Sequence, residues 1–397
     1  MYAEDHRQQD AALEAAGSYP SGQYRGRGLV ICAGGPRLFT CAWVLLRVLR
    51  DILHTSLPIE IWHRGATEMD DCMRSLLRRH GAEVVDACQA GSCETPGHGW
   101  ALKPFSILHS RFQEVIYLDA DNIPTVDPAQ LFDAAPYRET GALFWPDLHP
   151  IQAESPIWEI CRVTYREEPS FESGQIVLDK ARCWRPLSLA KHFNDRADFY
   201  YRHLYGDKDT FHMAWRFLGQ PYGMPPLPPR LMVSVDSEPP FLYIPAQRNF
   251  DGRVIFQHRN TPKFILLGWN PRYPGFRFED ECFAYLGELA RLWNGRVSTV
   301  ELAVPAHAGS GTGSRWFRYV QLSHGEQTIE LRADQRIGHG SSRWARTWRV
   351  IADGSRSALE IFGDECLICR LVRHEDGVWR GRWLRYERMP VELIPLS

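Results

Sequence analysis

The chain has 397 residues, more than one ordinary hydrophobic core accommodates, so two domains are expected. Its composition is 44% hydrophobic and 12% aromatic, which is typical of a globular protein and excludes an intrinsically disordered one. The formal net charge of -2 excludes a global basic field of the kind that attracts nucleic acid or anionic membranes.

The first 26 residues are polar and mixed in charge, and we expect residues 1–26 to form a flexible segment. They lack a basic start followed by an apolar run, so a secretory signal is not expected. No stretch approaches the roughly 18 consecutive apolar residues of a membrane span. The ten cysteines are scattered without the spacing of a zinc site, which favours reduced thiols in a cytoplasmic protein.

Strand and helix patterns alternate through the first third of the chain. Helical patterns occupy residues 38–54 and 67–81, with Thr67 as the expected N-cap and Gly81 as the stop. The strand-like runs are GLVICAGG (28–35), LPIEIWHRG (57–65), AEVVDA (82–87) and EVIYLDAD (114–121). This alternation predicts a mostly parallel α/β sheet with flanking helices, in which ligands gather at the carboxyl ends of the strands.

The pattern changes twice in the rest of the chain. Residues 127–243 are rich in proline and loops, which usually carry substrate contacts, and a last helix is predicted at 280–293. Beyond residue 297, short strand-like runs recur about every ten residues: TVELAV, RWFRYVQL, TIELR, RTWRVIA, ALEIF, CLICRLV, VWRGRWL and VELI. We therefore expect an α/β domain at 27–295 and a small antiparallel all-β barrel or sandwich at 297–397.

Two aspartates, Asp119 and Asp121, close the apolar run IYLDAD at residues 116–121. On an extended segment, side chains at i and i+2 point to the same side, so both carboxylates can share one hard cation such as Mg²⁺ or Mn²⁺. Three interpretations are open: solvated turn residues, a phosphatase with an aspartate nucleophile, and a nucleotide-sugar site. The phosphatase chemistry requires the pair on the first strand of its domain, whereas three strand–helix units precede it here.

A histidine and a lysine farther along the chain favour the nucleotide-sugar interpretation, with a purely structural histidine as the alternative. His258 ends another strand-like run, VIFQH, and Lys263 follows five residues later. A neutral imidazole completes a Mn²⁺ site, and an ammonium group neutralises the phosphate of a departing nucleotide. The chain has only five lysines, and four of them lie in segments suspected of forming the site: Lys103, Lys180, Lys208 and Lys263.

Six short motifs follow one another in an order that resembles the fungal-type α-mannosyltransferases and, more distantly, the glycogenin-like retaining glycosyltransferases. They lie between residues 28 and 263 and read AGG, ALKPFSI, YLDAD, ESGQIVLDK, GDKDTF and FQHRN followed by lysine. The glycogenin-like pattern has a glycine between its histidine and lysine; this chain lacks that glycine, and its lysine comes one residue sooner. The resemblance implies a GT-A fold, a nucleotide-sugar donor and Mn²⁺ or Mg²⁺.

The resemblance also implies roles for individual residues, position by position. The metal ligands would be Asp119, Asp121 and His258. Nucleotide and diphosphate contacts would come from Ala33, Gly34, Lys103, Asp119 and Lys263. The ESGQ stretch, residues 172–175, would form the wall against the sugar. Contacts to the sugar and the acceptor would come from Gln175, Asp207, Lys208 and Asp209. The aspartates of GDKDTF also suit the start of a helix, where one of them would act as the cap.

The predicted function is metal-dependent transfer of a sugar from a nucleotide-sugar to a hydroxyl acceptor. Mannose from GDP-mannose, with retention of configuration, follows from the resemblance, and UDP-sugars are an alternative. An inverting enzyme would need a base such as Asp207 or Asp209. The acceptor is a glycan, a small molecule or a protein, and no nucleic acid is expected. The alternative function is a non-catalytic carbohydrate- or nucleotide-sugar-binding protein on the same fold.

The expected C-terminal domain combines 14 arginines and five tryptophans with no lysine. Arginine beside tryptophan suits stacking on sugars or RNA bases. Tryptophans inside a small barrel with arginines outside explain the same pattern, and we favour this core packing. Twelve acidic residues leave a domain charge of only +2, which weakens the RNA interpretation. Glycan docking stays as a hypothesis.

Overall fold

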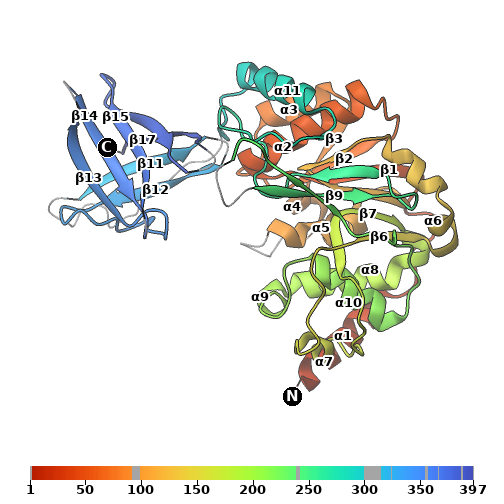
Figure 1. Cartoon of the computed structure of the whole chain (residues 1–397). Coiled ribbons are helices and arrows are strands. Elements are labelled where there is room, and N and C mark those ends of the chain that lie inside the picture. The colour runs from red at the N-terminus through yellow and green to blue at the C-terminus, as the bar shows by residue number, and fades with distance from the viewer. Residues whose placement is uncertain are drawn as a thin grey trace.

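The computed structural model describes residues 2–91, 99–237, 242–298, 314–322, 324–353, 356–364, 366–385 and 388–396. An α/β unit is followed by an all-β unit (Figure 1). The main sheet of the first unit has the order β3-β2-β1-β4-β7-β6. Its strands are β1 (Arg27–Cys32), β2 (Ile59–His63), β3 (Ala82–Asp86), β4 (Glu114–Asp119), β6 (Ala142–Pro146) and β7 (Phe171–Asp179). The first four in this order are parallel, and β7 runs antiparallel to both β4 and β6.

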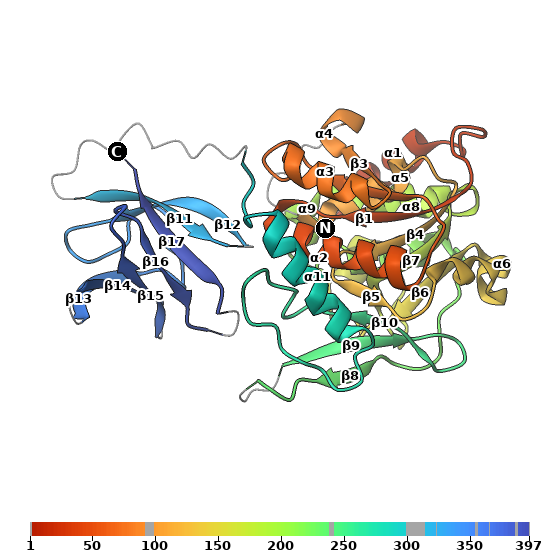
Figure 2. The same cartoon turned by 90° about the horizontal axis from the view of Figure 1, so that it is seen from above.

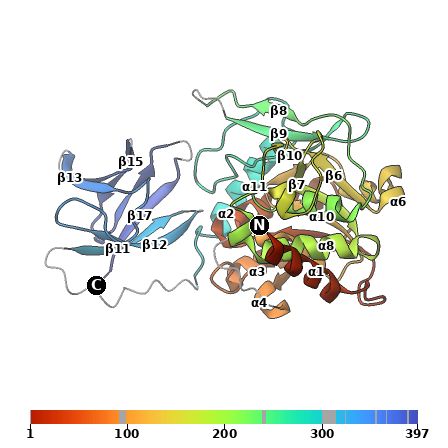
Figure 3. The same ribbon diagram turned by 90° about the horizontal axis from the view of Figure 1, so that it is seen from below.

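Helices cover both faces of this sheet because its strands are apolar on both sides. Leu29 and Ile31 of β1 pack with α2 (Gly35–Arg47), α3 (Asp71–Arg79) and α11 (Glu279–Leu292). Val30 points to the opposite face, against α5 (Leu102–His109), α8 (Lys180–Asp195) and α10 (Lys208–Leu218). Figure 2 shows α2 beside α11, and Figure 3 shows α1 (Ala3–Ala16), α8 and α10 together on the other side. The remaining turns are α4 (Ala87–Ala90), α6 (Ala135–Thr140), α7 (Ile157–Ile160), α9 (Ala197–Tyr200), η1 (Val48–Ile52), η2 (Gly99–Ala101) and η3 (Pro128–Asp133).

The N-terminal segment differs from our expectation of a flexible stretch over residues 1–26. Residues Ala3–Ala16 form helix α1, which packs along α8. Leu13 and Gln9, four residues apart and therefore on the same face, are buried, and the Gln9 side chain donates to the Ile160 carbonyl at 2.7 Å. This helix is ordered by a tertiary contact that its polar composition does not reveal.

Helix α3 also begins later than predicted. Asp70, rather than Thr67, is its N-cap, because the Asp70 carboxylate accepts a hydrogen bond from the Met73 amide at 2.9 Å. The other oxygen of Asp70 accepts bonds from the amide and hydroxyl of Ser298, both at 2.7 Å. The same carboxylate therefore starts the helix and holds the chain that leads to the C-terminal unit.

A second, antiparallel sheet has the order β5-β10-β9-β8. It consists of β5 (Asn122–Pro124), β10 (Val254–His258), β9 (Tyr243–Arg248) and β8 (Arg230–Val233). Strand β5 follows directly after Asp121, and its register sets His258 opposite Asn122. This pairing brings the end of β10 to the carboxyl end of β4, where the two aspartates lie.

The C-terminal unit is a seven-stranded antiparallel sheet in the order β12-β11-β17-β16-β15-β14-β13. Its strands are β11 (Arg315–Gln321), β12 (Gly325–Leu331), β13 (Thr347–Asp353), β14 (Arg356–Phe362), β15 (Leu367–Arg373), β16 (Trp379–Trp383) and β17 (Pro390–Pro395). Isolated bridges at residues 336–337 join the edge strands β12 and β13, which brings the sheet towards a barrel. Trp379 and Trp383 are buried in its core, as predicted, whereas Trp316, Trp344 and Trp348 are only half-buried. Seven of the eight expected strand runs coincide with these strands, and TVELAV lies outside the described residues.

The fold class expected from the sequence is therefore confirmed: a mostly parallel α/β sheet with flanking helices, followed by an antiparallel all-β unit. Ile265 of the first unit packs in the core of the second, and Arg296 pairs with Glu392. Within the part of the chain that the structure describes, no helix combines the length and apolarity needed to cross a membrane.

Candidate metal and nucleotide-sugar site

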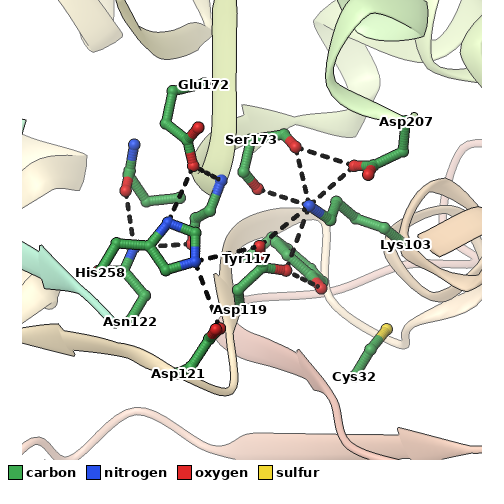
Figure 4. A network of polar contacts seen from close by, with 12 residues as sticks. Cys32, Lys103, Tyr117, Asp119, Asp121, Asn122, Glu172, Ser173, Asp207 and His258 are labelled. Carbon is green, nitrogen blue, oxygen red and sulfur yellow. Dashed lines mark hydrogen bonds and ion pairs between the residues drawn. The ribbon is translucent and has the colours of Figure 1, made fainter. Parts of the chain in front are cut away.

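Two carboxylates and one imidazole converge at the carboxyl end of β4. Asp119 ends this strand, Asp121 follows the turn, and His258 arrives from the end of β10 (Figure 4). The His258 Nε2 atom lies 3.3 Å from Asp121 Oδ1 and 3.8 Å from Asp119 Oδ2. One carboxylate oxygen of each aspartate and one imidazole nitrogen of His258 all lie within 4.8 Å of one another. Two carboxylate oxygens and an imidazole nitrogen are a donor set that suits Mn²⁺ and also accepts Mg²⁺.

The imidazole of His258 is oriented from behind by β7. Its Nδ1 atom lies 3.1 Å from Glu172 Oε1, and the same oxygen accepts a hydrogen bond from the Gly174 amide at 2.7 Å. A Cβ atom on Gly174 would lie only 2.6 Å from His258 Nδ1, so a larger residue cannot stand there unless the ring moves. A carboxylate that holds one imidazole nitrogen leaves the other free to face a metal ion.

The charges of this cluster are mutually dependent. Burial opposes ionisation of Asp121, but Lys263 and His258 outweigh it and hold the pKa of Asp121 well below its usual range. Burial raises the pKa of Asp119, although Lys103 and His258 act in the opposite direction. Burial also disfavours the charged form of His258, yet Asp121 and Glu172 prevail and raise its pKa to about 10. A metal ion bound here would replace the proton on Nε2, so binding would release a proton.

Lys263 and the backbone of β10 complete the support of Asp121. The Lys263 ammonium group hydrogen-bonds to the Asp121 carboxylate, and the Arg259 amide donates to the Asp121 carbonyl at 2.9 Å. The Lys263 side chain is 22% exposed, whereas that of Asp121 is 2% exposed. The expected contact of Lys263 with a diphosphate stays a prediction.

Lys103 forms a second centre beside Asp119. It is buried at the start of α5, and its ammonium group lies 3.2 Å from Asp119 Oδ1 and 2.8 Å from Asp207 Oδ2. It also donates to the carbonyl of Ser173 at 2.9 Å and to its hydroxyl at 2.8 Å. The hydroxyl of Tyr117 donates to Asp119 at 2.8 Å. Asp207 does not cap α10 with its side chain, contrary to the capping alternative, because its carboxylate is directed to Lys103 and Ser173.

Lys208 and Asp209 belong to a separate charged cluster. The Lys208 ammonium group lies 2.8 Å from Asp209 and 2.9 Å from Asp147. The remaining oxygen of Asp209 accepts a hydrogen bond from the Tyr205 amide at 3.1 Å. The expected roles of these residues towards the sugar and the acceptor stay predictions.

Of three further predicted residues, Ala33 and Gln175 are buried and Gly34 is half-buried. Ala33 is fully buried, and a Cβ on Gly34 would lie 1.9 Å from Glu68 Oε2, so Glu68 occupies the space beside that glycine. The oxygen of the Gln175 side chain accepts a hydrogen bond from Asn122 at 2.6 Å, and its amide nitrogen has no hydrogen-bond partner among the described residues. Contacts of Ala33 and Gly34 with a nucleotide, and of Gln175 with a sugar, stay predictions.

Lys180 was wrongly placed among the site lysines. Its ammonium group donates to the Ser110 carbonyl at 2.7 Å, and the neighbouring Asp179 pairs with Glu114 at the start of β4. Because β7 runs antiparallel to β4, the end of β7 lies at the edge of the sheet opposite Asp119. The short distance in sequence from the ESGQ motif concealed this reversal.

Sequence reasoning gave no individual role to Tyr117, Asn122, Glu172 or Ser173. Tyr117 lies two residues before Asp119 on the same strand, so its position on the same face was available from the period of an extended chain. Glu172 and Ser173 belong to the ESGQ stretch that was expected to line the sugar. Their contacts with His258 and Lys103 depend on the pairing of β7 with β4, for which the sequence carries no local signal.

A family model described as Mannosyltransferase matches residues 26–162 and 161–258, which is more than half of the chain. The chain belongs to this mannosyltransferase family, and the resemblance noted in the sequence is confirmed. It is similar to Alpha-1,2-mannosyltransferase MNN21 of Candida albicans, with 25% identity over 264 residues, covering 51% of this chain and 39% of that protein. It is also similar to Alpha-1,2-mannosyltransferase MNN2 of Saccharomyces cerevisiae, with 23% identity over 252 residues, 50% of this chain and 41% of that protein. The chain thus spans only about two-fifths of the length of these relatives.

Among solved structures, the chain has weak similarity to several glycosyltransferases. The WbbM bifunctional glycosyltransferase aligns with a TM-score of 0.37 and 12% identity, over 50% of this chain and 39% of that one. The galactosyltransferase LgtC in complex with donor and acceptor sugar analogs aligns with a TM-score of 0.34 and 13% identity, over 48% of this chain and 71% of that one. The family assignment rests on the sequence match.

Proposed function

We propose that this protein transfers mannose from GDP-mannose to an acceptor hydroxyl, with Mn²⁺ or Mg²⁺ held by Asp119, Asp121 and His258. The observation that carries the proposal is the convergence of these three side chains from β4 and β10 in a chain of the mannosyltransferase family. Mannose is supported by the family, and GDP and retention of configuration by the motif resemblance. A cytoplasmic location stays a prediction of the sequence.

The proposed reaction exchanges one bond at the sugar C1 atom for another, and it needs positive charge beside the leaving diphosphate. The bond between sugar C1 and the β-phosphate oxygen breaks, the acceptor oxygen bonds to C1, and the acceptor proton leaves to solvent or to the released diphosphate. The bound cation would stabilise the negative charge that develops on the diphosphate. Lys263 adds a second positive charge on the same side, beside Asp121.

The two candidates for the base of an inverting enzyme, Asp207 and Asp209, are both held in ion pairs. Each carboxylate has a lysine ammonium group at 2.8 Å, from Lys103 and Lys208 respectively. Carboxylates that already bind the chain's own cations suit positioning roles. Burial raises the pKa of Asp209 in spite of Lys208, so retention is supported by the motif resemblance alone.

The test is nucleotide release from GDP-, UDP-, ADP- and CMP-sugars with Mn²⁺, in wild-type protein and in Asp121→Asn. We expect release from one donor and at least a hundredfold loss in the variant. Asp127→Asn is the matched control, because Asp127 lies just beyond β5 and caps η3 by accepting from the Ala129 amide at 3.1 Å, a role that asparagine fills equally well.

Stability must be followed in the same experiment. Because the buried Asp121 carboxylate pairs with Lys263, we expect Asp121→Asn to lower the unfolding free energy as well, and assays belong well below the Tm of each protein. Mn²⁺ at about 100 times its Kd should stabilise the wild-type protein by about 2.7 kcal/mol and leave the Tm of the variant unchanged. If the protein binds nucleotide-sugars in the presence of Mn²⁺ but releases no nucleotide whichever acceptor is added, it is the non-catalytic binding protein instead.

A further inference from the structure

Two highly exposed aromatic side chains lie beside the charged network. Trp100, in η2, is 62% exposed, and Tyr205 is 82% exposed. They are the most exposed tryptophan and tyrosine among the residues that the structure describes. Rings of this size usually gain most of their stabilisation from burial, so two that face solvent near a functional site indicate a surface for a ligand.

Both rings are tied closely to the site by the chain. Trp100 precedes Lys103 by one turn, and Tyr205 precedes Asp207 by two residues. The Lys103–Asp207 ion pair, at 2.8 Å, joins these two segments. The Trp100 ring packs over Gly206, where a Cβ atom would lie 3.3 Å from its Cε3 atom. The Trp100 ring therefore lies against Gly206, which directly precedes Asp207, and Tyr205 directly precedes Gly206.

Polar side chains accompany the rings. The Lys208 ammonium group lies 5.9 Å from the centre of the Tyr205 ring and pairs with Asp147 at 2.9 Å. The side chains of Lys208 and Asp147 are 16% and 17% exposed, so both reach solvent. A hexose has an apolar face of C–H groups and a rim of hydroxyls. Aromatic rings with charged groups beside them offer a complementary surface to each of these parts.

We propose that Trp100 and Tyr205 form the acceptor subsite, where they stack on the apolar face of a hexose while Asp147 and Lys208 bind its hydroxyls. The inference rests on the proposed transferase function and makes it more specific. It assigns the acceptor to the saccharides and not to protein side chains or simple alcohols. The exposed rings are the sugar-binding surface, and the Lys103–Asp207 pair fixes them beside the reacting centre.

The experiment measures initial rates of the Mn²⁺-loaded full chain while donor and acceptor are varied independently, with methyl α-mannoside and a linear mannotriose as acceptors. In Trp100→Ala and in Tyr205→Ala, we expect the acceptor KM to rise on the order of tenfold, whereas the donor KM changes less than twofold. Trp100→Phe, which keeps a ring, should recover most of the loss. Val350→Ala is the control, since this apolar side chain is 48% exposed on β13 of the C-terminal unit.

Each outcome separates this inference from the proposed function. An acceptor KM within twofold of the wild-type value in both alanine variants would overturn the subsite. If the wild-type protein transfers no sugar, saturation-transfer NMR with mannotriose decides. Contact signals that vanish in Trp100→Ala, but not in Val350→Ala, support the subsite even where the transferase function fails. Absence of signals in the wild-type protein overturns it.

Discussion

Lys103 offers the strictest test of the electrostatics of the site. Its side chain is only 4% exposed, and its ammonium group forms ion pairs with both Asp119 and Asp207. The Asp207 side chain is itself only 9% exposed. Burial opposes its charge, but the two carboxylates outweigh it and raise the pKa of the ammonium group well above its ordinary value. Replacing Lys103 by methionine keeps the volume of the side chain and removes the cation that lies between these carboxylates.

The magnitude follows from the burial of the partners. Removing one member of a buried ion pair costs about 3–5 kcal/mol, chiefly because the remaining charge stays buried without compensation. We therefore expect Lys103→Met to lower the free energy of unfolding by about 4 kcal/mol. Adding Asp207→Asn removes one of the uncompensated charges, so the double variant should be about 2 kcal/mol more stable than the single one.

Urea titrations at neutral pH, followed by far-ultraviolet circular dichroism, provide the assay because the helices of the α/β unit dominate the signal. The matched control is Lys191→Met. Lys191 makes a 2.6 Å pair with Asp195, one turn away on the surface of α8, and such an exposed pair contributes about 0.3–0.5 kcal/mol. A loss below about 1 kcal/mol in Lys103→Met, or strict additivity with Asp207→Asn, would refute the reasoning.

Two further predictions concern the support of His258 and the dependence of stability on pH. Gly174→Ala should weaken Mn²⁺ binding at least tenfold, because the new Cβ would lie 2.6 Å from His258 Nδ1. The control is Gly287→Ala, which should bind Mn²⁺ like the wild type because nothing lies within 4 Å of its Cβ position. Equal Mn²⁺ affinity in the two variants would contradict the role of Gly174 in orienting His258. Burial lowers the pKa of His212 to about 4, whereas the unfolded chain binds this proton near pH 6.5. The unfolding free energy should therefore fall as the pH drops from about 6.5 to 4, by up to about 1.4 kcal/mol per pH unit for this group. His212→Gln should flatten that part of a urea-stability profile, and identical slopes in the two proteins would count against the assignment.

Local patterns determined much of the architecture. The apolar runs that end at Cys32 and Asp119 become neighbouring parallel strands, so the position of the aspartates at the carboxyl edge of the sheet was predictable. The regular spacing of apolar and turn residues predicted seven of the strands now described in the C-terminal unit. These predictions succeed because alternation along a strand and the stop signals of a helix act over a few residues.

Where local patterns were insufficient, the cause was a contact with a distant segment. Helix α1 has a polar sequence, and its order comes from packing on α8, far along the chain. Thr67 and Asp70 are both residue types that cap helices well. Asp70 is the cap in the structure, and its second carboxylate oxygen binds Ser298, which is distant in sequence. A composition-based expectation cannot include such partners, because they are brought near only by the complete fold.

The sequence by itself determined the two units, the α/β class of the first, the all-β class of the second, and the aspartates as the centre of the site. Only the tertiary structure decided which other groups face them. The register of β10 against β5 sets His258 opposite Asn122, and the reversal of β7 brings Glu172 to the site and carries Lys180 to the far edge. The physical reason is that strand pairing joins residues far apart in the chain, and a shift of one residue in register would turn every side chain to the opposite face.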